Sequence, residues 1–92
     1  MAVGRAARRI EREPRFVEVF GADGAPRALD LLEIVEFAWH DCYQELTPPD
    51  GVIDDMLVLS DGRLDRFVDA ARLAVTDWRD LRVAADQRRG GT

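Results

Sequence analysis

The chain has 92 residues, a length typical of one domain, and a formal net charge of −5. Its single cysteine, Cys42, excludes a framework of intramolecular disulfides and fits a reducing compartment. No apolar run approaches the roughly 18 residues of a membrane span, and no secretory signal follows Met1. We therefore expect a cytoplasmic protein with no membrane partner.

Charge is divided unevenly along the sequence. Residues 1–15 carry five arginines against Glu11 and Glu13, which sums to +3. Residues 28–55 carry eight acids and no lysine or arginine, which sums to −8. This asymmetry predicts an arm that folds back on its own body or reaches a second subunit.

Residues 1–13 are predicted to form a flexible, arginine-rich arm. They contain good helix formers but almost no apolar face, so an isolated helix would fray. Pro14 is expected to end any helix that forms there. The next apolar residues are aromatic or β-branched and predict a short extended segment: Phe16, Val17, Val19 and Phe20. Since the chain has no second strand pattern, this segment either packs on the helices or pairs with its copy in a dimer.

Residues 28–46 form the first strongly predicted helix. Its broad apolar face comprises Leu31, Leu32, Ile34, Val35, Ala38, Trp39, Cys42, Tyr43 and Leu46. A helix that is apolar around most of its girth is expected at the centre of the core.

Two further helices are predicted after this one. Thr47-Pro48-Pro49-Asp50 favours a helix over about 48–59, with Thr47 as its N-cap and Pro48 in the first position. A third helix is predicted over about 63–88, and its apolar residues recur alternately four and three apart: Phe67, Ala71, Ala74, Trp78, Leu81 and Ala85. We expect this seam to pass Thr76 without a break. The predicted fold is an all-α, three-helix domain over residues 14–89, with a tail at 90–92.

The acidic segment supplies the candidate partner-binding residues, which are Glu33, Glu36, His40, Asp54 and Asp55. A metal site is an alternative, because Glu33, Glu36 and His40 lie on one face of the predicted helix. The spacing of Glu36 and His40 is one residue longer than the Glu-x-x-His pairs of di-iron bundles. We therefore expect no metal and no cofactor. Core packing is the predicted role of Trp39 and Trp78, with a pocket lined by both as the alternative.

Few residues of the chain are usual nucleophiles or bases. It has one serine, one histidine, one cysteine and no lysine, and it lacks a Gly-rich phosphate loop. We therefore predict no enzymatic activity and no catalytic residue.

The sequence favours a small interaction or regulatory domain with an acidic surface for a basic protein partner. Self-association as a homodimer is predicted through Phe16, Val17, Val19, Phe20 and the third-helix seam. The main alternative is a regulator of nucleic-acid transactions, which acts through the arginine arm or as an acidic antagonist of a DNA-binding protein. Direct DNA binding by the body is disfavoured, because phosphates repel its acids.

Overall fold

The computed structural model describes residues 4–90 and contains three helices in that range. They are α1 (Arg5–Tyr43), α2 (Asp50–Ser60) and α3 (Leu64–Arg89), and the described residues form no strand. The predicted all-α, three-helix fold is confirmed. Residues 1–3 of the predicted arm and 91–92 of the predicted tail lie outside the described range. None of the helices within 4–90 combines the length and apolar character needed to cross a bilayer.

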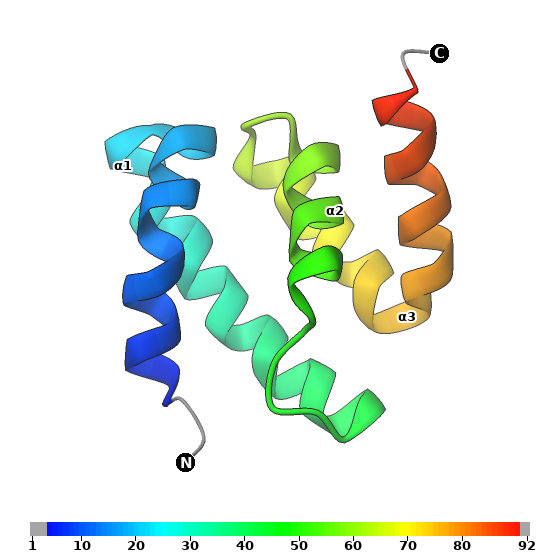
Figure 1. The fold of residues 1–92 in the computed structure, drawn as a ribbon, viewed down its shortest axis with the longest axis horizontal. Helices are drawn as coiled ribbons and strands as arrows, with labels where there is room; N and C mark the ends of the chain where they lie inside the picture. Colours follow the sequence, from blue (N-terminus) through cyan, green and yellow to red (C-terminus); the bar gives the residue numbers. More distant parts are fainter. Residues whose placement is uncertain (1–3, 91–92) are drawn as a thin grey trace.

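Helix α1 is divided by Gly21 into two legs that lie side by side. Gly21 has φ 78° and ψ 169°, a backbone region that is essentially restricted to glycine. Figure 1 shows the N-terminal leg (5–20, blue) running to the bend and the central leg (22–43, cyan to green) returning from it. The central leg ends at Tyr43 rather than at the predicted Leu46, because Gln44 adopts a left-handed φ of 63°.

The predicted extended segment at 16–20 and the predicted helix end at Pro14 are both wrong. Residues 5–20 are helical, so residues 5–13 of the arm that was predicted to be flexible are part of the folded body. Pro14 removes one helical hydrogen bond, but burial of Phe16 and ion pairs from the arm offset this loss. Phe16 and Phe20 are four residues apart, which is a helical spacing and explains why the apolar residues do not alternate as in a strand.

Helix α3 also contains a break, at Asp77, where the sequence predicted continuity. Asp77 has φ −159° and ψ 96°, and its Oδ1 accepts hydrogen bonds from the backbone N–H of Arg79 (3.0 Å) and of Asp80 (3.4 Å). This is the geometry of an N-cap, so a new helical leg (78–89, the C-terminal leg) begins after Asp77. In Figure 1 this orange-to-red leg turns back at the bend.

Helix α2 begins two residues later than predicted. Its first residue is Asp50, with Pro49 in the N-cap position, and no side chain caps it. Thr47 instead accepts a hydrogen bond from Arg12 Nη2 at 2.8 Å. The Thr47 hydroxyl, which was predicted to cap α2, therefore binds an arginine that is distant in sequence.

The core lies where the legs of α1 meet α2 and α3. Three phenylalanine rings form its aromatic centre: the Phe67 ring lies 5.9 Å from the Phe16 ring and 5.3 Å from the Phe20 ring, edge to face in both pairs. Most of the third-helix seam is buried within the chain. Its buried residues are Phe67, Ala71, Ala74, Leu81 and Ala85.

Candidate functional site

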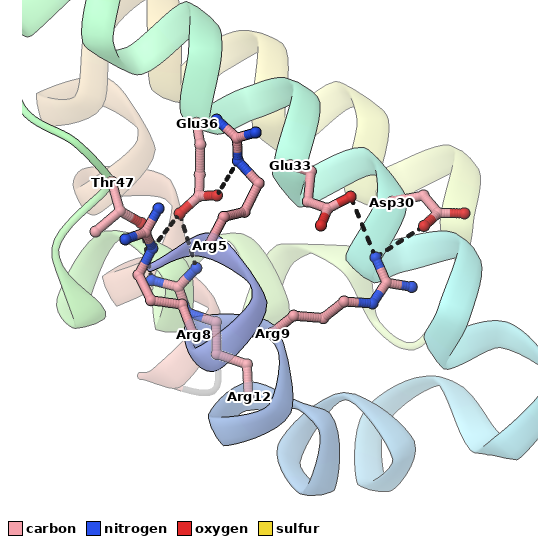
Figure 2. A network of polar contacts seen from close by, with 8 residues as sticks. All are labelled: Arg5, Arg8, Arg9, Arg12, Asp30, Glu33, Glu36 and Thr47. Carbon is pink, nitrogen blue, oxygen red and sulfur yellow. Dashed lines mark hydrogen bonds and ion pairs between the residues drawn. The ribbon is translucent and has the colours of Figure 1, made fainter. Parts of the chain in front are cut away.

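Glu36 lies at the centre of a network of arginines from the N-terminal leg, drawn in Figure 2. Arg8 Nε donates to Glu36 Oε2 at 2.7 Å, and Arg12 Nη1 lies 3.3 Å from the same oxygen. Arg5 Nε lies 3.6 Å from Glu36 Oε1. The Glu36 side chain is almost fully buried, so these guanidinium groups replace the water that an ionised carboxylate requires.

The arginines keep Glu36 ionised despite its burial. Burial by itself would raise the pKa of the Glu36 carboxyl, because it disfavours the charged form. Hydrogen bonds from Arg8 and Thr47 and the charges of Arg8 and Arg12 act in the opposite direction. Their combined effect is stronger, and the pKa of Glu36 lies below its ordinary value of about 4.5.

The remaining arginines of residues 5–15 also pair with carboxylates of the acidic segment. Arg9 Nη1 lies 2.8 Å from Asp30 Oδ1 and 3.3 Å from Glu33 Oε2, as Figure 2 shows. Arg15 Nη1 lies 3.0 Å from Asp54 Oδ1. Of the two predicted positions of the arm, the structure therefore has the one in which the arm folds back on its own body.

A second buried carboxylate, Asp55 of α2, is held by the C-terminal leg. Arg82 Nε donates to Asp55 Oδ2 at 2.6 Å, and Arg89 Nη1 lies 2.8 Å from Asp55 Oδ1. Arg89 Nη1 also lies 3.1 Å from Asp86 Oδ1. Two acids and two arginines therefore form a compact group with no net charge.

Four of the five predicted partner-binding residues are thus engaged by arginines of the same chain. They are Glu33, Glu36, Asp54 and Asp55, whereas His40 is exposed and makes no ion pair within residues 4–90. The alternative metal site is not assembled either: across the described range, no three His, Cys, Asp or Glu side chains are grouped to hold a metal ion.

The predicted self-association residues belong mainly to the protomer's own core. Phe16 is buried, and Val19 and Phe20 are partly buried and pack against the core cluster. Only Val17 is exposed among the four. In this fold, therefore, Phe16 is not available at the surface for a dimer contact.

An apolar groove lies on the surface between the central leg of α1 and the first part of α3. Its volume is about 210 Å³, and its lining comprises Leu31, Ile34, Val35, Ala38, Val68, Ala71, Arg72 and Val75. Ile34 and Val68, from opposite sides of the groove, are 64% and 37% exposed. The sequence contained a signal for this groove: the apolar face of 28–46 is wider than one neighbouring helix can cover.

Both tryptophans of the chain line a second cavity, of about 260 Å³, near the C-terminal end of the central leg. Tyr43, Glu45 and Arg82 contribute further to its wall. Trp39 is buried, as predicted, but Trp78 is 37% exposed, and the alternative, a pocket lined by both tryptophans, is present.

The Trp39 indole fixes the position of one polar group at this pocket: its Nε1–H donates to Glu45 Oε1 at 3.1 Å. Tyr43 is fixed by α3, because its hydroxyl donates a hydrogen bond to the Ala74 carbonyl at 3.2 Å. The aromatic wall is thereby joined to both α3 and the loop that follows α1.

Comparisons with known proteins place the chain in no family: no protein-family model matches it, and no curated protein or solved structure matches it at a significant level.

Proposed function

We propose that the chain is a small, non-enzymatic interaction domain that self-associates through the groove between α1 and α3. The observation that carries this proposal is an open groove whose lining is apolar except for Arg72, with Ile34 largely exposed at its edge. Apolar surface of this kind is typical of sites where one protein meets another. A cytoplasmic location, expected from the sequence, is part of the proposal.

A second copy is the proposed occupant because the face carries both parts of a self-complementary contact. A two-fold interface brings the same patch of two copies together, so the patch must contain both a hollow and a projection. Here the hollow is the groove, and the projection is Ile34, a residue of its lining that is 64% exposed. The patch is small compared with the roughly 800 Å² per partner of a standard interface, so we expect a weak dimer.

The sequence predicted a basic protein partner for the acidic residues, but arginines of the same chain already contact most of these residues. The arginines of the N-terminal and C-terminal legs neutralise the charges of these acidic residues, which such a partner would otherwise contact. Regulation of nucleic-acid transactions through the arm stays a prediction. All five arginines of residues 5–15 are paired with carboxylates here, so phosphate binding by the arm requires these pairs to open.

Sedimentation velocity over a concentration series tests the proposed self-association. The wild-type chain is expected to shift from monomer toward dimer at high micromolar concentration, and Ile34→Asp is expected to abolish the shift by placing a charge in an apolar contact. Val83→Asp is the matched control, because Val83 is also exposed (56%) but lies outside the groove. A wild-type chain that stays monomeric throughout, or a dimer that both variants weaken equally, would contradict the proposal.

A further inference from the structure

The cavity between the end of α1, the loop after it, the start of α2 and the C-terminal leg combines aromatic walls with one fixed carboxylate. Trp39, Tyr43 and Trp78 supply the aromatic surface, and Glu45 supplies the carboxylate. We propose that this cavity is a binding site for a methylated ammonium group, carried by a small molecule or by a methylated lysine side chain. The proposal is independent of the self-association proposed above, which uses a different surface.

Glu45 is the first element of the argument, because its position is set by the aromatic wall itself. The Trp39 indole donates to Oε1, and no described residue donates a hydrogen bond to Oε2. The hydrogen bond to Oε1 therefore holds the carboxylate at the cavity, and Oε2 is left to interact with a ligand. A methylated ammonium ion suits such a position, since it carries a positive charge without requiring strong hydrogen bonds.

The face of Trp78 is the second element, because it already attracts a cation within the molecule. The guanidinium carbon of Arg79 lies 5.4 Å from the centre of the Trp78 ring. This distance is within the range in which the negative face of an indole attracts a positive charge. Trp78 also retains 37% exposure, so part of the indole is open to a ligand.

Arg82, which also lines the cavity, is the feature that could repel a cation, but its charge is compensated locally. Arg82 and Arg89 pair with Asp55, and Arg89 also pairs with Asp86. The two positive and two negative charges of this group sum to zero, so Glu45 is the remaining charged residue of the lining. The Arg79 guanidinium over Trp78 is the cation that a bound ammonium group would replace. Gly51 fits this arrangement: a Cβ there would lie 2.9 Å from Arg82 Nη2, so the absence of a side chain lets the guanidinium group take its place in the wall.

Intrinsic fluorescence provides the test, because both tryptophans of the chain line the cavity. The probes are choline and the neutral alcohol in which carbon replaces the choline nitrogen. The two have nearly the same shape, so they separate the effect of charge from that of apolar contact. We expect a saturable change in emission with millimolar or lower choline, and about tenfold weaker binding of the neutral alcohol.

Variants identify the groups responsible, with affinities measured by isothermal titration calorimetry. Glu45→Gln is expected to weaken choline binding several-fold and to leave binding of the neutral alcohol unchanged. Trp78→Leu is expected to weaken choline binding about tenfold, whereas Trp78→Phe, which keeps an aromatic face, restores most of it. Val83→Ala, outside the cavity, is the control. If Trp78→Leu fails to fold, the Glu45→Gln result still decides, because Glu45 is exposed in a loop.

The ligand source is resolved by a parallel titration with a short peptide that carries one trimethyllysine, with the unmethylated peptide as reference. Tighter binding of choline indicates a small molecule, and tighter binding of the methylated peptide indicates a protein tail; either result supports the proposal. Equal affinity for choline and its neutral analogue, or no saturable change with any methylated probe, would overturn it.

Discussion

The N-terminal leg and the C-terminal leg both place several arginines around one buried carboxylate, but they differ in what surrounds the ion pairs. At Glu36 the side chains of Arg8 and Arg12 are only 14% and 15% exposed. At Asp55 those of Arg82 and Arg89 are 46% and 39% exposed. Arg5, the third arginine at Glu36, is 44% exposed. Two of the three arginines at Glu36 are therefore enclosed by protein, whereas both arginines at Asp55 are open to water.

The two legs also differ in their apolar anchors. The N-terminal leg inserts Phe16 into an aromatic cluster with Phe67. The C-terminal leg buries the smaller side chains of Leu81 and Ala85. Solvent-exposed ion pairs contribute little to stability, so the same arginine–carboxylate arrangement should matter more at the enclosed end. The contrast implies that the N-terminal leg is the more firmly attached of the two.

The largest expected effect is the loss of the N-terminal anchor. Phe16→Ala should lower the free energy of unfolding by about 3–5 kcal/mol, because it leaves a cavity beside the two remaining phenylalanines. Urea denaturation followed by circular dichroism measures this. Val17→Ala, next to it but 39% exposed, is the control, with an expected change below about 1 kcal/mol. Similar values for the two variants would mean that the leg is not anchored by Phe16.

The comparison of the two carboxylates gives the next effect. Glu36→Gln should destabilise the fold by about 3 kcal/mol, because it leaves nearly buried guanidinium groups without a counter-charge. Asp55→Asn should lower stability by only about 1.5 kcal/mol, because water can solvate Arg82 and Arg89. Parallel urea titrations of both variants measure the difference. A larger loss of stability for Asp55→Asn than for Glu36→Gln would mean that the C-terminal leg is the more firmly attached.

The smallest effect concerns the pH dependence of the N-terminal network. The pKa of Glu36 is below its ordinary value of about 4.5 in the folded chain, so unfolding raises it. The stabilisation is therefore complete above about pH 4.5 and decreases as the pH falls through the folded pKa. The arginines stay charged throughout, so only the carboxylate titrates.

Urea midpoints measured from neutral to acidic pH provide the check. The wild type is expected to lose more stability on acidification than Glu36→Gln, which has no carboxylate at this position. Parallel pH profiles for the two proteins would mean that Glu36 has the same pKa in the folded and unfolded chain.

The part of the fold that could be predicted from the sequence is the part that periodic apolar residues determine. Helices were expected over 48–59 and 63–88, and the structure has α2 at Asp50–Ser60 and α3 at Leu64–Arg89. The N-terminal leg was not recognised because its stabilising partners are remote in sequence. Arg8 and Glu36, for example, are separated by 28 positions. Local propensity contains no information about such a pair.

The candidate site shows the same limit. The acidic residues were predicted to bind a partner, and the structure pairs four of the five with arginines of the same chain. Charge counts predicted attraction between 1–15 and 28–55, and they did not distinguish contact within a chain from contact between chains. The groove at Ile34 and the cavity at Trp78 depend on which side chains the helix bends leave uncovered, and the bend at Asp77 was not predicted.

The bend at Gly21 affects whether the ion pairs of the N-terminal leg form within one chain or between two chains. If the backbone there were helical, α1 would be a rod of 39 residues, about 58 Å long, with Arg8 roughly 42 Å from Glu36 along its axis. The arginine pairs could then form only between chains, with each N-terminal leg docked on the body of its neighbour. Such an exchange keeps every contact of the closed protomer and changes only the hinge, as in domain swapping. The bend at Gly21 therefore lets these ion pairs form within a single protomer.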